Sequence, residues 1–377
     1  MTKKFIKLIS IISLISILLI LCSTGASAKA SDSYLPAASY AFTNIHLGSS
    51  QTHRTSDVSA TPLSDRDYSK LKLYVGGMPF GVKFLTEGVI IVGFNEAAPA
   101  NPAKAAGLRR NDVIISVNGR KVFSAESLNE AVRQNGNKAM TIEYTRDGKV
   151  RSTVLTPANS KADGSYNLGI YVRDSGAGIG TVTFIDPKTC AFGGLGHGIC
   201  DGGTGKLIPM QRGSVLDVRI NGIVKGLSGS PGEVKGFFNS GKTGTLLSNT
   251  DCGVYGILAE LPKEIQGEPM SLGLRHSVKE GKAYLCSMLD GTRVERYEIE
   301  ISEIKRSSTD NKSFVVKVTD KRLIDKTGGI IQGMSGSPII QDGKLIGAVT
   351  HVLINDPTTG YGIFIENMLN QMGDLAG

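Results

Sequence analysis

Short runs in which apolar and polar residues alternate, separated by glycine turns, make up most of this chain after residue 71. Residues 140–144 and 150–154 alternate in this way on either side of an Asp-Gly pair, which favours a tight β-hairpin. From residue 166 to about residue 366 strand-like runs and glycine turns continue, and residues 367–375 are predicted to form a closing helix. The pattern predicts a mainly β protein, with a compact domain over residues 71–157 and a larger one over residues 166–377.

Helix signals are concentrated in the first of these two domains. Pro102 can begin a short helix that Gly107 ends, and Ser124 can cap a second helix that Gly136 stops. With the strand-like run over residues 113–119, this order of elements resembles the core of a PDZ domain, a peptide-binding module.

PDZ domains bind an extended peptide as an added strand, while loop amides hold its terminal carboxylate. The resemblance implies that the loop over residues 78–82 is the carboxylate cradle, with Phe80, Gly81 and Val82 as peptide-binding residues. The strand that continues to Leu85 would then be the docking edge. The alternative is that Phe80 and Val82 are ordinary core residues.

The N-terminal 28 residues have the pattern of an export signal. Three lysines precede an uncharged stretch over residues 8–28, and Ala26-Ser27-Ala28 is a small-residue cleavage pattern. The stretch is also long enough to span a bilayer, so both a cleaved signal peptide and a signal anchor are physically allowed. Residues 29–70 are rich in Ser, Thr and Ala with little periodicity, which predicts an exposed spacer.

Composition excludes several classes of function. The formal charge is +8, but no run of basic residues or aromatic platform accompanies it, so we expect no nucleic-acid partner and at most an affinity for anionic membrane surfaces. The mature chain retains Cys190, Cys200, Cys252 and Cys286, whose spacing lacks paired zinc ligands. We expect no metal and no cofactor, and the disulfide state stays open.

Ser335 is the strongest candidate for a catalytic residue. It lies in Gly333-Met334-Ser335-Gly336-Ser337-Pro338, directly before a predicted hairpin. Glycines around a serine allow two backbone N–H groups to converge on an oxyanion, as in trypsin-like peptidases. This predicts a nucleophilic serine, with the backbone amides of Gly333 and Ser335 as the oxyanion hole.

A serine nucleophile needs a base, and the chain has five histidines. His46, His53 and His276 lie in polar segments where solvated roles are expected. His197 stands between two glycines, which is typical of a sharp turn that exposes the imidazole. His351 lies at the end of the strand after the serine turn, where a packed structural role is expected, so His197 is the favoured base.

The acid that would orient this base is less clear from spacing. The candidate aspartates all fall in the same half of the chain: Asp201, Asp217, Asp251, Asp320, Asp325 and Asp356. Asp320 ends a strand-like run 15 residues before Ser335, which gives the chain order His, Asp, Ser of chymotrypsin-type enzymes. A role as an ordinary strand-end residue is the alternative.

A second hexapeptide, Gly-Leu-Ser-Gly-Ser-Pro over residues 226–231, mimics the turn around Ser335. No long apolar strand follows Ser228, and only about thirty residues separate it from His197. These features favour Ser335 as the nucleophile.

Two segments of the chain resemble the stage IV sporulation protein B peptidases of endospore-forming bacteria: residues 319–367, and the Gly-Leu-Gly-His sequence that ends at His197. The resemblance covers roughly residue 70 to the C-terminus. It implies a trypsin-like double β-barrel peptidase domain after the PDZ domain, with His197 as base, Asp320 as orienting acid and Ser335 as nucleophile.

The resemblance also implies a biological role. Such a serine endopeptidase would be exported across the forespore inner membrane into the intermembrane space, where it would cut its own N-terminal spacer. It would then cleave a regulator of an intramembrane metalloprotease complex, which processes a sigma-factor precursor. The alternative is an inactive extracytoplasmic PDZ scaffold that binds peptides in signalling.

Overall fold

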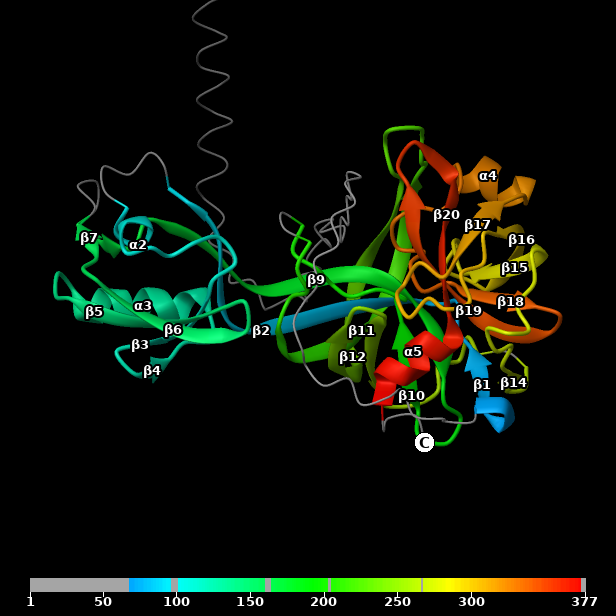
Figure 1. Ribbon diagram of the computed structural model, residues 1–377, viewed down its shortest axis with the longest axis horizontal. Coiled ribbons are helices and arrows are strands. Elements are labelled where there is room, and N and C mark those ends of the chain that lie inside the picture. Colours follow the sequence, from blue (N-terminus) through cyan, green and yellow to red (C-terminus); the bar gives the residue numbers. More distant parts are fainter. Residues whose placement is uncertain (1–67, 96–100, 160–163, 203–204, 266, 374–377) are drawn as a thin grey trace, which may run out of the picture. The chain divides into compact units, whose positions relative to one another are not determined.

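Two antiparallel β-barrels and a smaller domain of strands and helices form the part of the chain that this computed structural model describes: residues 68–95, 101–159, 164–202, 205–265 and 267–373 (Figure 1). The predicted leader and nearly all of the predicted spacer lie outside these residues. None of the helices in the described ranges has the length and apolar character needed to cross a membrane.

The first barrel has six strands, and it closes because β2 pairs with both β9 and β11. These strands are β2 (Pro79–Phe94), β9 (Ile170–Ile185), β10 (Ala191–Gly194), β11 (Met210–Val224), β12 (Glu233–Thr250) and β13 (Gly253–Leu258). The second barrel follows in sequence and also closes with six strands. They are β15 (Gly281–Ser287), β16 (Glu295–Ser302), β17 (Phe314–Val318), β18 (Pro338–Gln341), β19 (Lys344–Leu353) and β20 (Asp356–Phe364). The predicted mainly β, double-barrel architecture is confirmed.

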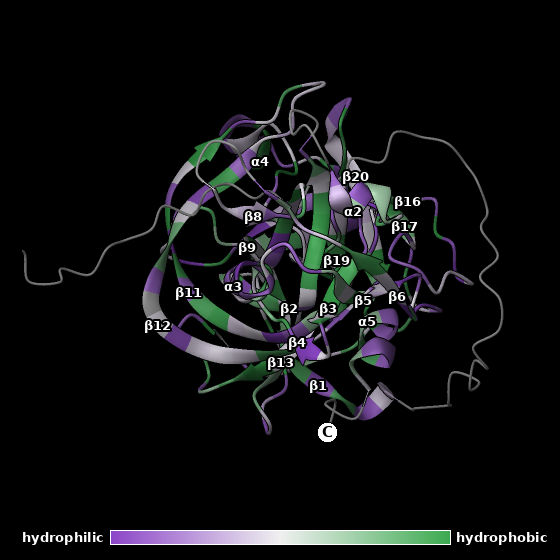
Figure 2. Ribbon diagram, turned by 90° about the vertical axis from the view of Figure 1, so that its left-hand side faces the viewer, coloured by the Kyte–Doolittle hydropathy of each residue, from purple (hydrophilic) through white to green (hydrophobic). Residues whose placement is uncertain are grey.

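The alternating sequence pattern explains these barrels, because successive side chains of a strand point to opposite faces of a sheet. In β16 the tyrosine and isoleucines at positions 297, 299 and 301 are buried, while the residues between them are polar. β19 is apolar over most of its length because it is covered on both faces, and Figure 2 shows it largely in green. The β11–β12 hairpin is more exposed and varies between green and purple (Figure 2).

The smaller domain has the order of elements predicted for a PDZ domain. It contains α2 (Pro102–Ala105), β3 (Val113–Val117), β4 (Arg120–Lys121), α3 (Ala125–Asn135), β5 (Met140–Arg146), β6 (Lys149–Leu155), β7 (Ala158–Asn159) and β8 (Tyr166–Asn167). The predicted cap is present, since the Ser124 side chain accepts a hydrogen bond from the Ser127 amide. Two long strands, β2 and β9, belong to both this domain and the first barrel, so the two predicted domains share strands.

The structure contradicts the prediction that Phe80, Gly81 and Val82 bind a peptide. These residues lie in the barrel half of β2, where one edge pairs with β9 and Gly81 and Val82 pair with β11 on the other. The side chains of Phe80 and Val82 are buried in the barrel core. A strand that is paired on both edges has no free backbone groups to offer a peptide, so the core alternative is the correct one.

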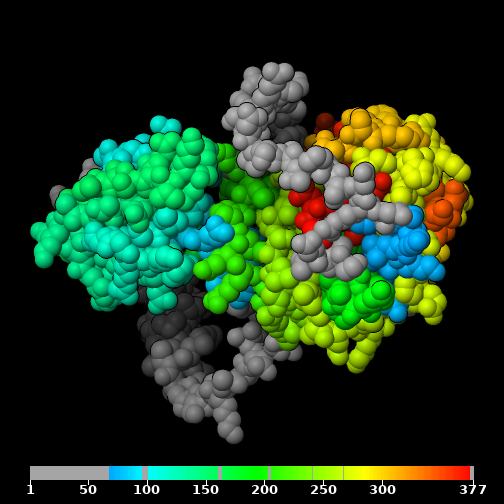
Figure 3. Space-filling view, turned by 60° about the horizontal axis from the view of Figure 1, so that its bottom comes forward, coloured from blue at the N-terminus to red at the C-terminus, as the bar shows by residue number. Residues whose placement is uncertain are grey.

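The first and last described segments of the chain lie against each other. A short 3-10 helix, η1 (Tyr68–Lys70), is followed by β1 (Lys72–Val75), which pairs with β9 and with β14 (Met270–Ser271). The Tyr68 hydroxyl donates a hydrogen bond of 2.9 Å to Asn370 in α5 (Ile365–Met372). In Figure 3 the blue N-terminal and red C-terminal residues accordingly lie close together.

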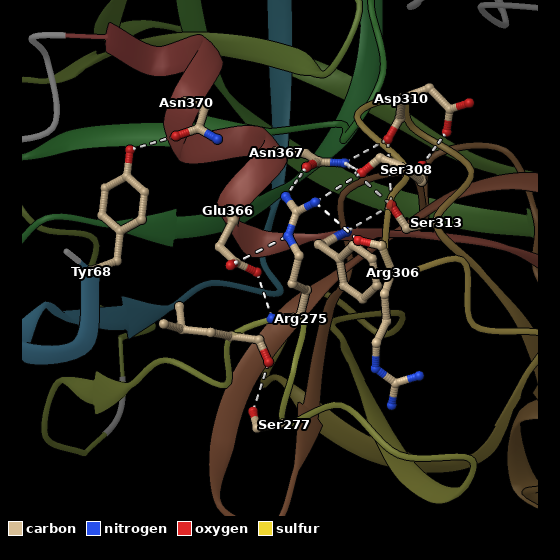
Figure 4. A network of polar contacts seen from close by, with 12 residues as sticks. Tyr68, Arg275, Ser277, Arg306, Ser308, Asp310, Ser313, Glu366, Asn367 and Asn370 are labelled. Carbon is tan, nitrogen blue, oxygen red and sulfur yellow. Dashed lines mark hydrogen bonds and ion pairs between the residues drawn. The ribbon is translucent and has the colours of Figure 1, made fainter. Parts of the chain in front are cut away.

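Arg275 ties α5 to the loop between β16 and β17 (Figure 4). Its guanidinium donates to the Asn367 side chain at 2.7 Å and to the Ser308 carbonyl at 3.3 Å, and it forms an ion pair with Glu366 at 3.4 Å. This network fixes the C-terminal helix against the second barrel. A helix α4 (Lys321–Thr327) follows β17.

Candidate active site

Ser335 lies on the turn that leads into β18, and glycine is required on both sides of it. Gly333 and Gly336 have φ angles of 97° and 92°, which side chains with a Cβ rarely adopt. A Cβ on Gly336 would also lie 2.2 Å from the Thr181 carbonyl oxygen. Ser335 itself is half-buried, and its hydroxyl donates a hydrogen bond of 2.9 Å to the Thr350 carbonyl.

His197 lies on a second sharp turn, which follows β10. Leu195 and Gly196 both adopt left-handed conformations, with φ angles of 65° and 67°. The imidazole is only 4% exposed, and Nδ1 lies 2.8 Å from the Gly198 carbonyl oxygen. Because a carbonyl can only accept, Nδ1 must carry the proton, which leaves Nε2 of the neutral ring as a proton acceptor. Burial lowers the pKa of His197 below its ordinary value of 6.5, although the Gly198 carbonyl opposes this effect.

The end of β19 brings the serine and the histidine turns together. Residue 336 donates its amide to the Val349 carbonyl at 2.8 Å, next to the Ser335 contact with Thr350. The histidine turn packs against the same strand, because a Cβ on Gly196 would lie 2.9 Å from the Thr350 side chain. The rings of His197 and His351 have centroids 5.0 Å apart. The first barrel therefore supplies the candidate base and the second the candidate nucleophile.

The side chains of Ser335 and His197 each hydrogen-bond a backbone carbonyl, and among the described contacts they do not bond each other. Catalytic hydrogen bonds are often long in free enzymes and tighten when substrate binds. For proton transfer to His197, the Ser335 hydroxyl must give up its hydrogen bond to the Thr350 carbonyl.

The two amides predicted as the oxyanion hole are available. The backbone N–H groups of Gly333 and Ser335 donate no hydrogen bond among the described residues, whereas the amides of Met334, Gly336 and Ser337 each bond a carbonyl. Free amides on a glycine-flanked turn beside a nucleophile can stabilise an oxyanion.

Asp320 does not contact His197 in this structure. It caps α4 through the Arg322 amide at 2.9 Å, accepts from the Glu298 amide at 3.1 Å, and forms an ion pair of 2.8 Å with the Arg322 guanidinium. The hydrogen bond from Arg322 lowers the pKa of Asp320.

Strand register also separates Asp320 from the site. Tyr361 of β20 pairs with His351 of β19 on one side and with Val315 of β17 on the other, so Val315 lies two strands away from His351. Asp320 follows five residues later, which is roughly 15 Å further along the chain. In this structure Asp320 therefore does not make the predicted contact with His197.

This placement leads to a prediction that compares two variants of Asp320. Asparagine caps a helix about as well as aspartate, so Asp320→Asn should keep most of the peptidase activity. Asp320→Ala should lower the free energy of unfolding by about 1 kcal/mol because the cap is lost. Activity assays and thermal unfolding of both variants check this. A loss of roughly 10⁴-fold in kcat for Asp320→Asn would instead identify it as the orienting acid.

The remaining candidates from the sequence lie elsewhere or are inert. Ser228 is exposed at the tip of the β11–β12 hairpin, where its hydroxyl donates to the Asn355 carbonyl.

The structure contains no disulfide between the four described cysteines. Burial raises the thiol pKa of Cys200 and Cys286 to about 11 and that of Cys252 to about 12, which disfavours nucleophilic thiolates.

A free strand edge lies where the sequence did not predict one. The first residues of β9, Ile170 to Arg173, pair with β2 on one side and with no other strand in the described parts of the chain. Helix α3 packs beside them, because the Ala125 amide donates to Asp174 at 2.7 Å. The turn before this edge contains Gly169, with a φ angle of 73°. A strand edge beside a helix, preceded by a glycine turn, is the arrangement that PDZ domains use to bind peptides.

Two family models match this chain. A family model described as SpoIVB peptidase S55 matches residues 164–369, and one described as PDZ domain matches residues 76–156. The probable protease eep of Enterococcus faecalis is 32% identical over 93 residues, which are 23% of this chain and 22% of that protein. Serine protease HTRA1 of Xenopus laevis is 40% identical over 57 residues, which are 15% of this chain and 12% of that protein. The matches thus span less than a quarter of the length of these two relatives.

Two solved structures were also matched. The active form of the Rv3671c protease from M. tuberculosis is 16% identical, and the match covers 66% of this chain and 85% of that chain with a TM-score of 0.28. The PDZ domain of the SdrC-like protein from Listeria monocytogenes is 18% identical, with coverage of 23% and 87% and a TM-score of 0.20.

Proposed function

The chain belongs to the SpoIVB peptidase S55 family, and from this premise we propose that it is a serine endopeptidase that cuts itself and a regulatory protein in sporulation signalling. Ser335 is the nucleophile and His197 is the general base. One observation carries this proposal: the turn that bears His197 and the turn that bears Ser335 both contact residues 349–351 at the end of β19. The first turn comes from the first barrel and the second from the second barrel.

The geometry supports a two-step acyl transfer. Nε2 of His197 takes the proton from the Ser335 hydroxyl as its oxygen attacks the peptide carbonyl carbon. Negative charge then develops on the carbonyl oxygen, and the free amides of Gly333 and Ser335 are the donors for it. The protonated imidazole gives its proton to the leaving amine, and water hydrolyses the acyl enzyme by the same steps. The Gly198 carbonyl holds the ring in the required tautomer and stabilises its charged form.

A peptide partner is proposed to bind the PDZ part at the free edge of β9, over residues 170–173, beside α3. Main-chain hydrogen bonds along the edge would supply affinity, and side chains of α3 would supply selectivity. This strand edge replaces the segment around Gly81 as the candidate docking site. The edge lies on the same strand as Thr181, which contacts the turn that carries Ser335.

The biological setting is part of the proposal and rests on the family. The peptidase would be exported into the space between the forespore membranes, with its N-terminal segment as a cleaved signal or an anchor. Its protein substrates would be its own N-terminal spacer and the regulator of an intramembrane metalloprotease complex that processes a sigma-factor precursor. An inactive PDZ scaffold is the alternative, but a scaffold has no need for free amides beside a glycine-flanked serine.

Self-cleavage tests the proposal directly. We expect the wild-type chain to shorten itself within residues 29–67, because the residues from Tyr68 onward are packed: Tyr68 is buried and hydrogen-bonded to Asn370. Ser335→Ala should stay full length. Mass spectrometry and N-terminal sequencing of the products check both statements. Equal trimming of the Ser335→Ala protein, or cuts confined to residues 166–377, would contradict the proposal.

A further inference from the structure

The turn around Ser335 is held in place through its carbonyl groups. The carbonyl oxygens of five successive residues each accept a hydrogen bond from another part of the chain or from the turn itself; these residues are Gln332, Gly333, Met334, Ser335 and Gly336. In a trans peptide the N–H and the C=O point in opposite directions. Because the Val234 and Ser337 amides bind the Gln332 and Met334 carbonyls, the amides of the residues that follow, Gly333 and Ser335, point away from these two donors.

One residue of the first barrel supplies two of these anchors. The Thr181 hydroxyl donates to the Gly333 carbonyl at 2.7 Å, and its amide donates to the Ser335 carbonyl at 3.0 Å. Its own carbonyl accepts from the Leu195 amide at 3.2 Å, on the turn that precedes His197. Thr181 is 3% exposed. A single buried side chain and its backbone thus join the serine turn to the histidine turn.

The hydroxyl bond is the anchor that a substitution can remove. The peptide unit that joins Gly333 to Met334 lies between the two peptide units that carry the free amides, and Gly333 has no Cβ to restrict its rotation. Its carbonyl receives the Thr181 hydroxyl as a donor, while the amide of Met334 on the same peptide unit donates to Ile331. Without the hydroxyl this peptide unit keeps only the bond from the Met334 amide to the Ile331 carbonyl, so the angle between the two oxyanion donors is less tightly fixed.

Thr183, on the same strand, acts on the next part of the turn. β9 is irregular here, because the consecutive residues Gly193 and Gly194 pair with Phe184 and Val182 and leave Thr183 without a partner between them. The Thr183 hydroxyl donates to the Gly336 carbonyl at 2.7 Å, and the side chain is completely buried. Both threonines therefore direct their hydroxyls from the first barrel at the nucleophile turn of the second.

We propose that Thr181 is a positioning residue for the reaction: its hydroxyl fixes Gly333 so that the amides of Gly333 and Ser335 converge on the oxyanion. This inference rests on the proposed roles of Ser335 and these two amides. Valine has nearly the shape of threonine and keeps the backbone amide, so Thr181→Val removes only the hydroxyl bond. Thr181→Ser keeps the hydroxyl and removes only a methyl group.

The test measures the rate of covalent labelling by a fluorophosphonate probe, whose phosphonyl oxygen occupies the oxyanion site, together with self-cleavage of the full chain. Thr181→Val should lower the maximal labelling rate and the self-cleavage rate by roughly 10-fold to 100-fold, with little change in the probe concentration needed for half-maximal labelling. Thr181→Ser should restore both rates to within about 3-fold of the wild type. Thr153→Val is the matched control, because it removes a hydroxyl bond to the Ala106 carbonyl far from this turn, and it should label as the wild type does.

The outcomes separate this inference from the proposed function. If the wild type is not labelled at Ser335, the proposed function fails and the inference fails with it. If the wild type is labelled and Thr181→Val reacts equally fast, the inference alone is overturned. Equal losses in the valine and serine variants would also overturn it, since the variant that keeps the hydroxyl would then be as impaired as the variant that lacks it. Should Thr181→Val not fold, Thr181→Ala removes the same hydroxyl and is compared with Thr181→Ser in the same way.

Discussion

Replacing Ser335 by alanine is expected to lower peptidase activity by roughly 10⁶-fold, because loss of the nucleophile removes the covalent step altogether. The fold should survive, since the Ser335 side chain makes one hydrogen bond, to the Thr350 carbonyl, and is half-buried. The cost in the free energy of unfolding should be about 1 kcal/mol. Cleavage of an added protein substrate and thermal unfolding measure the two effects separately.

The chain contains its own matched control for this experiment. Ser228 stands in the same Gly-x-Ser-Gly-Ser-Pro sequence and also donates to a backbone carbonyl, that of Asn355. It is exposed on a hairpin tip, so Ser228→Ala should leave activity within about 2-fold of the wild type, as expected for surface positions. Loss of activity in Ser228→Ala, with activity retained in Ser335→Ala, would reverse the assignment of the nucleophile.

Removal of the base should have an effect of similar size. His197→Ala is expected to lower kcat by several orders of magnitude, because Nε2 of its neutral ring is the proposed acceptor of the serine proton. His276→Ala is the control, since His276 is exposed, and it should leave kcat unchanged.

The pH dependence follows from the burial of His197. Desolvation lowers its pKa below 6.5, so the neutral, active ring should persist to a lower pH and the acid limb of kcat/KM should lie below pH 6.5. The unfolded chain binds this proton more readily than the folded one. The contribution of His197 to stability is therefore complete above pH 6.5 and is lost as the pH falls toward the lowered folded-state pKa. Thermal unfolding from pH 5 to 8 should show this loss in the wild type and less of it in His197→Ala.

Local sequence patterns predicted the elements of the barrels and the two glycine turns well, because both depend on neighbouring residues. Alternation placed the apolar faces of the strands, and the glycines around Ser335 mark positions where a positive φ is needed. His197 and Ser335 could be paired in advance because few histidines stand on such turns. The elements of the PDZ part followed from caps, notably that at Ser124.

Long-range pairing was the part that local patterns could not predict. Nothing in the residues from Pro79 onward shows that β2 passes from the barrel into the PDZ part, or that Gly81 lies between two strands. Asp320 was chosen on the family resemblance together with its spacing from Ser335. An aspartate at a strand end before a helix serves equally well as a cap, and Arg322 two residues later favours that use. No local sequence pattern pointed to Thr181, because its proposed role arises from contacts with residues about 150 positions away.

Locating the covalent adduct after reaction with a fluorophosphonate probe tests the central claim most directly. The wild-type chain is treated with the probe, digested, and analysed by tandem mass spectrometry, with heat-unfolded protein as the control. We expect a single adduct on the Ser335 hydroxyl in the folded protein, its loss in His197→Ala, and none in the unfolded control. An adduct on Ser228, or a folded wild-type protein that does not react, would contradict the account.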